Sequence, residues 1–118
     1  MSKSTVKPRL NAFQNQAGTC YYCGSPMWLK EIEPFAIKHA LSLSAAARFQ
    51  CTAEHLIARC DGGSDDKRNI VAACLFCNIN RHRRKNPPPP PHYKALIQRR
   101  LKQGKWHPKQ LHLVSLPV

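Results

Sequence analysis

Two Cys-x-x-Cys pairs constrain this chain more than any other feature of its sequence. Cys20 and Cys23 form the first pair, Cys74 and Cys77 form the second, and 50 residues lie between the pairs. Four thiolates are the ligand set of a closed tetrahedral zinc site. A metal that closes so long a loop restricts the unfolded chain strongly. The sequence therefore predicts a structural zinc ion that joins two distant segments.

A redox role for one of these pairs is the alternative to zinc binding. Redox pairs at this spacing lie in a βαβ setting, which the flanking sequence does not predict, so we favour zinc. The two other cysteines, Cys51 and Cys60, fit no second pair. They are predicted to be small buried hydrophobic side chains, with a reactive thiol as the alternative.

The size and charge of the chain agree with a zinc-stabilised nucleic-acid binder. The chain has 118 residues, and the part expected to pack, residues 9–86, is short for a purely hydrophobic core. Nineteen Lys and Arg against six Asp and Glu give a formal charge of +13. From residue 79 onward there are ten basic side chains and no acidic one. Nucleic acid would relieve this repulsion; a merely soluble basic protein is the alternative.

Changes in composition divide the chain into four predicted parts. These are a flexible basic arm at residues 1–8, a folded domain at 9–86, a basic C-terminal extension at 92–118, and a semi-rigid polyproline linker at 87–91 that separates the domain from this extension. No segment has the apolar length of a membrane span, and the N-terminus lacks the apolar run of a signal peptide. We therefore expect an intracellular, cytoplasmic protein with no membrane partner.

Hydrophobic periodicity predicts an α+β fold for the domain. The expected elements are a short helix from Pro8 that Gly18 stops, helices within 34–49, a strand over 49–58, a strand over 69–73 and a helix over 75–85. Asp61-Gly62-Gly63 predicts a loop between the strands. The extension is expected to form a basic amphipathic helix over 92–103, followed by an edge strand in its last eight residues.

A group of polar residues matches the needs of phosphodiester hydrolysis. This reaction needs an activated water, a cation on the scissile phosphate and a residue that holds the base in place. Glu54 and His55 are adjacent on a predicted strand, so they point to opposite sides unless the strand bends. Asn78 and His82 lie four apart on one helix face, as two ligands of one ion would. Taken singly, each is more often a cap or surface decoration.

In this stretch the chain resembles the HNH endonuclease family, in its zinc-knuckle branch. The resemblance runs over about residues 20–84 and rests on Glu54-His55, the Gly-Gly loop, Asn69-Ile70 and the Cys-x-x-Cys pair that Asn78 follows directly. It implies a small ββα-metal, treble-clef-like core with a structural zinc, added N-terminal helices and a basic C-terminal tail. Asn78 stands where many relatives have His, so the chain is an HNN variant.

The resemblance also implies a role for each site residue. Glu54 is expected to bind a catalytic divalent ion, His55 to activate water as the general base, and Asn69 to brace the loop and orient His55. Asn78 is expected to be a second ligand of the catalytic ion, and His82 is an additional candidate. Oxygen ligands favour Mg²⁺ or Mn²⁺, and Ni²⁺ becomes competitive if His82 also binds.

The implied function is that of a metal-dependent endonuclease that hydrolyses phosphodiester bonds in DNA. A monomer would nick one strand, whereas a double-strand break would need two events, a homodimer or a larger nuclease assembly. The side chains expected to contact the phosphate backbone are Arg59, Lys67, Arg68, Arg81, Arg83, Arg84, Arg99 and Arg100. The alternatives are a non-catalytic, zinc-dependent nucleic-acid-binding module and an RNA-directed nuclease.

Overall fold

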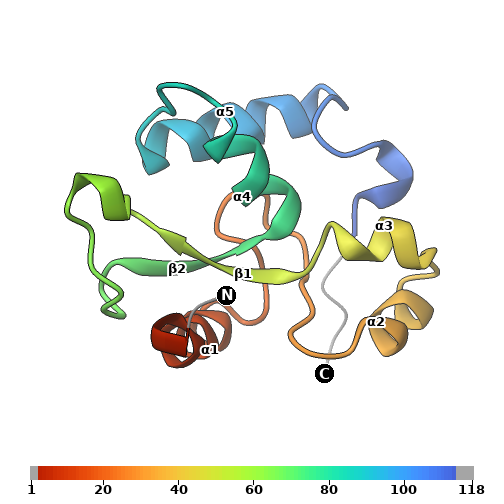
Figure 1. Ribbon diagram of the computed structural model, residues 1–118. Coiled ribbons are helices and arrows are strands. Elements are labelled where there is room, and N and C mark those ends of the chain that lie inside the picture. Colours follow the sequence, from red (N-terminus) through yellow and green to blue (C-terminus); the bar gives the residue numbers. More distant parts are fainter. Residues whose placement is uncertain (1–2, 114–118) are drawn as a thin grey trace.

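In the computed structural model, which describes residues 3–113, two antiparallel strands form the centre of the fold. Strand β1 covers Cys51–His55 and β2 covers Ile70–Cys74, with Cys51 opposite Cys74 and His55 opposite Ile70. Helix α4 (Leu75–His82) follows β2 directly and packs on both strands. This β1–β2–α4 order is the small α+β, ββα core that the sequence predicts (Figure 1).

Further helices surround this core. Helix α1 (Val6–Asn15) packs against the strands on the face opposite to α4, and α5 (Pro90–Lys102) lies beyond α4 (Figure 1). Helices α2 (Ile32–Lys38) and α3 (Leu43–Ala47) pack against each other near the start of β1. Three 3-10 turns complete the elements of the described residues: Lys3–Thr5, Arg59–Asp61 and Lys109–Leu111. Over residues 3–113, no helix combines the length and apolarity needed to traverse a lipid bilayer.

Helix α1 begins earlier than predicted and ends at Asn15, shortly before the predicted stop at Gly18. Pro8 is the third residue of the helix, where its missing N–H has no intrahelical partner to lose. The predicted flexible arm is therefore wrong for residues 3–8, which form a 3-10 turn and the first turn of α1, with Thr5 buried. After the helix, Gly18 has a φ of +73°, a left-handed conformation that glycine adopts without strain.

The C-terminal extension packs onto the core. Pro90 is already the first residue of α5. Tyr93 and Ile97, one turn apart on α5, are fully buried in the same hydrophobic cluster as the four paired cysteines. For residues 92–113, the predicted separation from the domain is therefore wrong, because the apolar face of α5 packs against the core. The edge strand expected at 111–118 lies mostly outside the described residues.

Helices α2 and α3 form a scaffold around a second hydrophobic cluster. Its buried members are Phe35, Ala36, Ala46 and Phe49. Ser42 caps α3, since its hydroxyl accepts a hydrogen bond of 3.1 Å from the Ala45 amide. The chain then runs directly from this scaffold into β1, which carries two of the predicted site residues.

Candidate metal centre and active site

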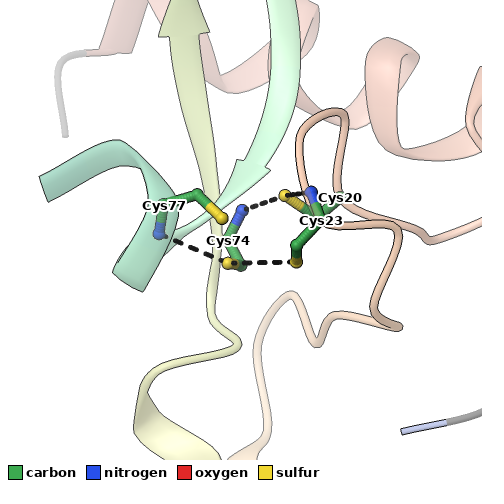
Figure 2. A group of neighbouring side chains, drawn as sticks. All are labelled: Cys20, Cys23, Cys74 and Cys77. Carbon is green, nitrogen blue, oxygen red and sulfur yellow. Dashed lines mark hydrogen bonds between the residues drawn. The ribbon is translucent and has the colours of Figure 1, made fainter. Parts of the chain in front are cut away.

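The four paired cysteines meet at one end of the sheet. Cys20 and Cys23 come from the loop after α1, Cys74 ends β2, and Cys77 lies in the first turn of α4 (Figure 2). Their sulfur atoms all lie within 4.8 Å of one another, and all four residues are buried. Within residues 3–113 no other group of three or more His, Cys, Asp or Glu gathers in this way. The donor set and its spacing fit a tetrahedral zinc ion.

The protonation of these thiols also favours a bound cation. The pKa of Cys23 lies far below its ordinary value because its sulfur interacts by hydrogen bonds with Cys20, Cys74 and Cys77. The pKa of Cys74 is raised first by its hydrogen bond with Cys20, and the pKa of Cys77 is raised first by burial. Because the metal-binding form of cysteine is the thiolate, zinc binding to this cluster is expected to release protons from the thiols.

Glu54 lies at the centre of a buried polar network between β1 and α4. It is 1% exposed. Its Oε2 accepts hydrogen bonds from the Tyr22 hydroxyl at 3.1 Å and from Arg81 at 3.4 Å, and its Oε1 lies 2.8 Å from His82 Nε2. Burial and then the charge of Glu54 raise the pKa of Tyr22, so Tyr22 stays protonated and donates. These partners compensate a carboxylate that burial alone would disfavour.

The guanidinium of Arg81 is buried and bonded within the protein. Its side chain is 7% exposed and forms an ion pair with Glu54. Its second guanidinium nitrogen donates a hydrogen bond of 3.2 Å to the Pro88 carbonyl, which ties the proline run to α4. The phosphate contact of Arg81 stays a prediction, and the buried pairing of its guanidinium with the Glu54 carboxylate does not favour it.

His55 pairs with an acidic side chain that sequence reasoning missed. Its Nε2 lies 2.7 Å from Oδ1 of Asp65, in the loop before β2. Asp65 also accepts hydrogen bonds from Arg59 and from the Ser4 hydroxyl. These hydrogen bonds lower the pKa of Asp65 to about 2, and the bond with His55 has the largest effect. The carboxylate of Asp65 is therefore charged at neutral pH. The one sequence signal was an acidic pair, Asp65-Asp66, directly after the glycine loop of a basic chain.

Asn69 braces the loop between the strands through three hydrogen bonds. Its amide nitrogen donates to the carbonyls of Ile57 at 3.0 Å and Ser64 at 2.8 Å, and its Oδ1 accepts from the Ile57 amide at 2.8 Å. These contacts suit the bracing part of its predicted role. The side chain that touches His55 is Asp65, so Asn69 can orient His55 only through the loop that it holds.

Gly63 allows this loop to close. A Cβ atom at Gly63 would lie 1.7 Å from the carbonyl oxygen of Ile57. We expect Gly63→Ala to displace the loop and to lower the free energy of unfolding by roughly 1–3 kcal/mol, the usual cost of overpacking, as measured by thermal unfolding. Gly62→Asn is the matched control, because a Cβ atom there meets nothing within 4 Å and Asn tolerates its φ of +89°. Equal unfolding temperatures for Gly63→Ala and the unaltered protein would contradict this role.

Two of the predicted ligands of the catalytic ion lie side by side. Glu54 Oε1 and His82 Nε2 are 2.8 Å apart, close to the separation of about 3 Å for adjacent ligands that each lie about 2.1 Å from one ion. Asn78, one turn earlier on α4, donates through its amide nitrogen to Thr52 Oγ1 at 2.9 Å. The carboxylate and the imidazole thus fit a divalent ion, whereas Asn78 hydrogen-bonds to β1.

A cavity of about 440 Å³ opens beside His55. It is lined by Thr5, Ala53, His55, Ala58, Arg59, Cys60 and His82. His55 and His82 therefore face one space, although Glu54 and His55 diverge from β1 as strand alternation predicts. A second cavity of about 630 Å³ shares Ala58, Cys60 and His82 with the first and has Arg84 and Lys85 among its lining residues.

The two unpaired cysteines differ from each other. Cys51 is fully buried as predicted, and burial raises the pKa of its thiol to about 12. Cys60 is exposed and lines both cavities, so the prediction of a buried side chain is wrong for it. The reason is local, because Cys60 lies in the 3-10 turn Arg59–Asp61 that leads into the surface glycine loop.

Most of the other basic side chains that were predicted to contact DNA lie on the surface. Lys67, Arg68, Arg83, Arg84 and Arg99 are exposed, whereas Arg100 is half-buried. Arg59 is exposed and pairs with Asp65 at 2.9 Å, and Arg68 pairs with Asp66 at 3.0 Å. Exposed ion pairs are weak, so a phosphate can compete for these guanidinium groups.

Comparison with known proteins identifies the segment that contains this site. A family model described as HNH endonuclease matches residues 20–84, more than half of the chain. The matched segment includes both cysteine pairs, both strands and α4. No curated protein and no solved structure matches the chain.

Proposed function

This chain belongs to the HNH endonuclease family, and on that basis we propose that it is a metal-dependent nuclease that hydrolyses DNA, with His55 as the general base. The observation that supports this most is the His55–Asp65 pair, 2.7 Å apart, in the wall of the 440 Å³ cavity that His82 also lines. A formal charge of +13 suits a polyanionic substrate.

Asp65 selects the nitrogen of His55 that acts as the base. When the carboxylate accepts a hydrogen bond from Nε2–H, the neutral imidazole has its lone pair on Nδ1. Nδ1 then takes a proton from the attacking water, the water oxygen bonds to phosphorus, and the bond from phosphorus to the leaving oxygen breaks. Asp65 stabilises the imidazolium that forms.

Glu54 and His82 would hold the catalytic ion, with Asn78 as a further candidate ligand. Mg²⁺ or Mn²⁺ suits a set rich in oxygen, and Ni²⁺ suits the imidazole. When bound, such an ion stabilises negative charge on the phosphate and on the leaving oxygen. Tyr22 and Arg81 hold Glu54 in place on its other oxygen.

A non-catalytic, zinc-dependent nucleic-acid-binding module is the second candidate, and one observation favours it. Arg81 already compensates the charge of Glu54 inside the protein, as a catalytic ion would. If the Arg81–Glu54 pair is permanent, the zinc centre and the basic surface would account for the whole function.

Cleavage of supercoiled plasmid by the zinc-loaded protein distinguishes these candidates. Mg²⁺, Mn²⁺ or Ni²⁺ is added or omitted, and zinc content is checked so that the structural site stays filled. Conversion to nicked circles only with an added ion supports the nuclease. DNA binding without cleavage under every ion would favour the binding module. Cleavage of RNA alone would favour an RNA-directed nuclease.

Replacing Asp65 with asparagine is expected to slow cleavage by roughly 10-fold or more, because the amide neither fixes the tautomer of His55 nor stabilises its imidazolium. The initial rate of plasmid nicking measures this. Asp66→Asn is the matched control, since Asp66 pairs with Arg68 on the exposed loop. Equal rates for the two variants would remove Asp65 from the mechanism.

Asp65 also predicts a pH dependence of stability. Its pKa falls from 3.8 to about 2 in the folded protein, so the folded state favours the charged form. Its stabilising effect is therefore present above about pH 4 and is lost as the pH falls towards 2. The difference in unfolding temperature between Asp65→Asn and the unaltered protein should disappear over the same range.

A further inference from the structure

Two residues that follow α5 reach the four-cysteine cluster. The indole Nε1–H of Trp106 donates a hydrogen bond of 3.3 Å to Cys77 Sγ. His107 is 1% exposed, and the centroid of its ring lies 5.2 Å from the ring centroids of both Phe49 and Phe76. The C-terminal segment thus brings two N–H-bearing rings to a centre that the two Cys-x-x-Cys pairs define.

The imidazole of His107 is buried without a hydrogen-bond partner. Neither of its ring nitrogens makes a hydrogen bond within the part of the chain that the structure describes. Buried polar groups nearly always have a partner, and an unpaired one is costly. The imidazole lies close enough to Cys23 to interact with its side chain, and the preceding residue, Trp106, contacts Cys77 Sγ at 3.3 Å. A thiolate at Cys23 would be a stronger acceptor for His107.

We propose that Trp106 and His107 donate hydrogen bonds to the thiolates of Cys77 and Cys23 in the zinc-bound protein. The C-terminal segment is then a part of the zinc site. Four thiolates leave two negative charges after one Zn²⁺ is bound, and N–H donors disperse this charge. This inference goes beyond the nuclease function and does not depend on it.

The other sulfur environments follow the same pattern. Cys20 Sγ accepts hydrogen bonds from the backbone amides of Cys74 at 3.2 Å and Tyr22 at 3.3 Å. The guanidinium carbon of Arg48 lies 3.8 Å from the centroid of the Phe76 ring. Burial lowers the pKa of Arg48, and the charges of Cys74 and Cys77 act in the opposite direction. Trp106 and His107 thus supply side-chain donors to a centre that already has backbone donors and a cation.

His107 is assigned as a donor and not as a zinc ligand. The four sulfur atoms lie within 4.8 Å of one another, and His107 is outside that group. Four thiolates already complete a structural zinc site. The carbonyl of His107 accepts a hydrogen bond of 2.7 Å from His112 Nε2, which holds this segment in place.

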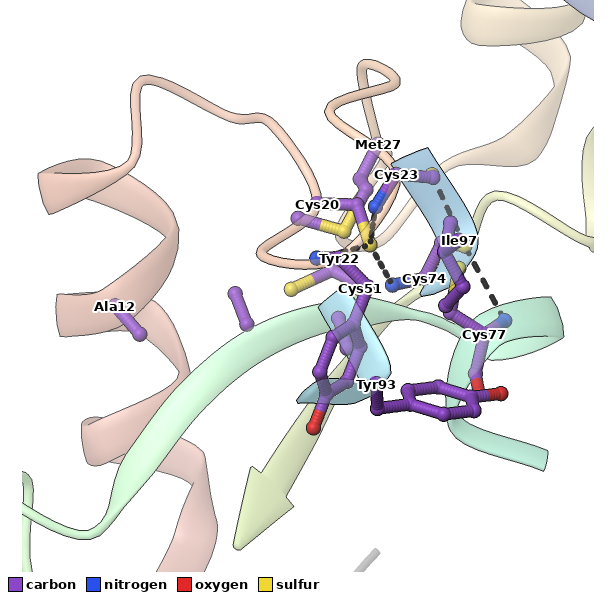
Figure 3. Close-up of a cluster of buried hydrophobic side chains, with 12 residues drawn as sticks. Ala12, Cys20, Tyr22, Cys23, Met27, Cys51, Cys74, Cys77, Tyr93 and Ile97 are labelled. Atoms are coloured by element: carbon purple, nitrogen blue, oxygen red, sulfur yellow. Dashed lines mark hydrogen bonds between the residues drawn. The ribbon is translucent and has the colours of Figure 1, made fainter. Parts of the chain in front are cut away.

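Helix α5 connects the two donors to both halves of the zinc site. The Tyr93 hydroxyl donates a hydrogen bond of 3.2 Å to the Cys77 carbonyl, and Gln98 Nε2 donates one of 2.7 Å to the Tyr22 carbonyl. Figure 3 shows Tyr93 and Ile97 beside the cysteines in the buried cluster. Zinc binding and docking of the C-terminal segment should therefore strengthen each other.

The test uses the full chain and measures metal binding directly. Zinc affinity is measured by competition with a chromophoric chelator, and the Co²⁺-substituted protein reports the thiolate-to-metal absorption. Trp106→Phe and His107→Phe are each expected to weaken zinc binding by roughly 10- to 100-fold and to shift the thiolate-to-cobalt band. His107→Gln retains an N–H donor, so its zinc affinity is expected to lie nearer that of the unaltered protein.

Two controls match the substitutions. Trp28→Phe loses an indole hydrogen bond of 2.8 Å to the Ala46 carbonyl, and His92→Phe alters an exposed histidine on α5. Zinc affinities and cobalt spectra of the Trp106 and His107 variants that equal those of the controls would overturn the proposal. Cobalt ligand-field bands that report a lost ligand in His107→Phe would also overturn it. Since no readout involves cleavage, this result is independent of whether the protein is a nuclease.

Discussion

Replacing His55 with alanine is expected to lower the rate of DNA cleavage by at least roughly 100-fold, because the variant has no group to accept the proton of the attacking water. DNA affinity and zinc content are expected to stay unchanged. His55 pairs with Ile70 at one end of the sheet, and Cys51 pairs with Cys74 at the other, so the zinc centre is remote from the substitution. Plasmid nicking under conditions of excess protein measures the rate, and a gel-shift titration measures the affinity.

His92→Ala is the matched control, because it removes an exposed histidine from the start of α5. Its cleavage rate should equal that of the unaltered protein. Added imidazole should restore part of the activity of His55→Ala if the missing group is a base. A His55→Ala variant that nicks plasmid at the unaltered rate would exclude His55 as the base and favour the binding module.

Replacing Cys77 with serine is expected to unfold the protein at ordinary temperatures. Cys77 is fully buried and lies in the main hydrophobic cluster. Structural zinc binding is worth about 10–16 kcal/mol in zinc-finger peptides, whereas small domains are stable by only about 5–15 kcal/mol. The loss of one thiolate from this site should therefore remove most of the folding free energy. Far-UV circular dichroism and zinc content per chain measure the effect.

Cys60→Ser is the control for this substitution, because Cys60 is an exposed cysteine outside the four-sulfur cluster. It should retain one zinc ion and the unaltered unfolding temperature. In the unaltered protein, removal of zinc by a chelator should cause the same unfolding, and added zinc should reverse it. A Cys77→Ser variant that keeps both its zinc and its unfolding temperature would show that the cluster is not the structural centre.

Several parts of the fold were predictable because their signals are local. The strand over Cys51–His55 follows from its alternating pattern, and the end of α1 follows from Gly18. The meeting of the cysteine pairs was predictable from chemistry, since four thiolates at this spacing form the ligand set of one zinc ion. The bracing of the loop by Asn69 follows from the family resemblance, and three hydrogen bonds are consistent with it.

The surroundings of the site residues were less predictable. A helical pattern shows that Arg81 and His82 are adjacent, but only the position of β1 shows that both face Glu54. Asp65 looked like one of several acidic loop residues, and the loop conformation alone brings it to His55. Side-chain pairing of this kind depends on the path of the backbone between the two residues, which periodicity does not describe.

The sequence by itself determined the small α+β core and the four cysteines that could bind zinc, and it predicted the residues of the candidate site, because residue type and spacing carry that chemistry directly. Only the tertiary structure decided that Arg81 pairs with Glu54 inside the protein and that Asp65 pairs with His55. It alone also brings Trp106 to Cys77 Sγ and buries His107 beside it. The physical reason is that burial and charge compensation arise between segments far apart in the chain. Their free energies depend on distances that exist only after those segments have packed.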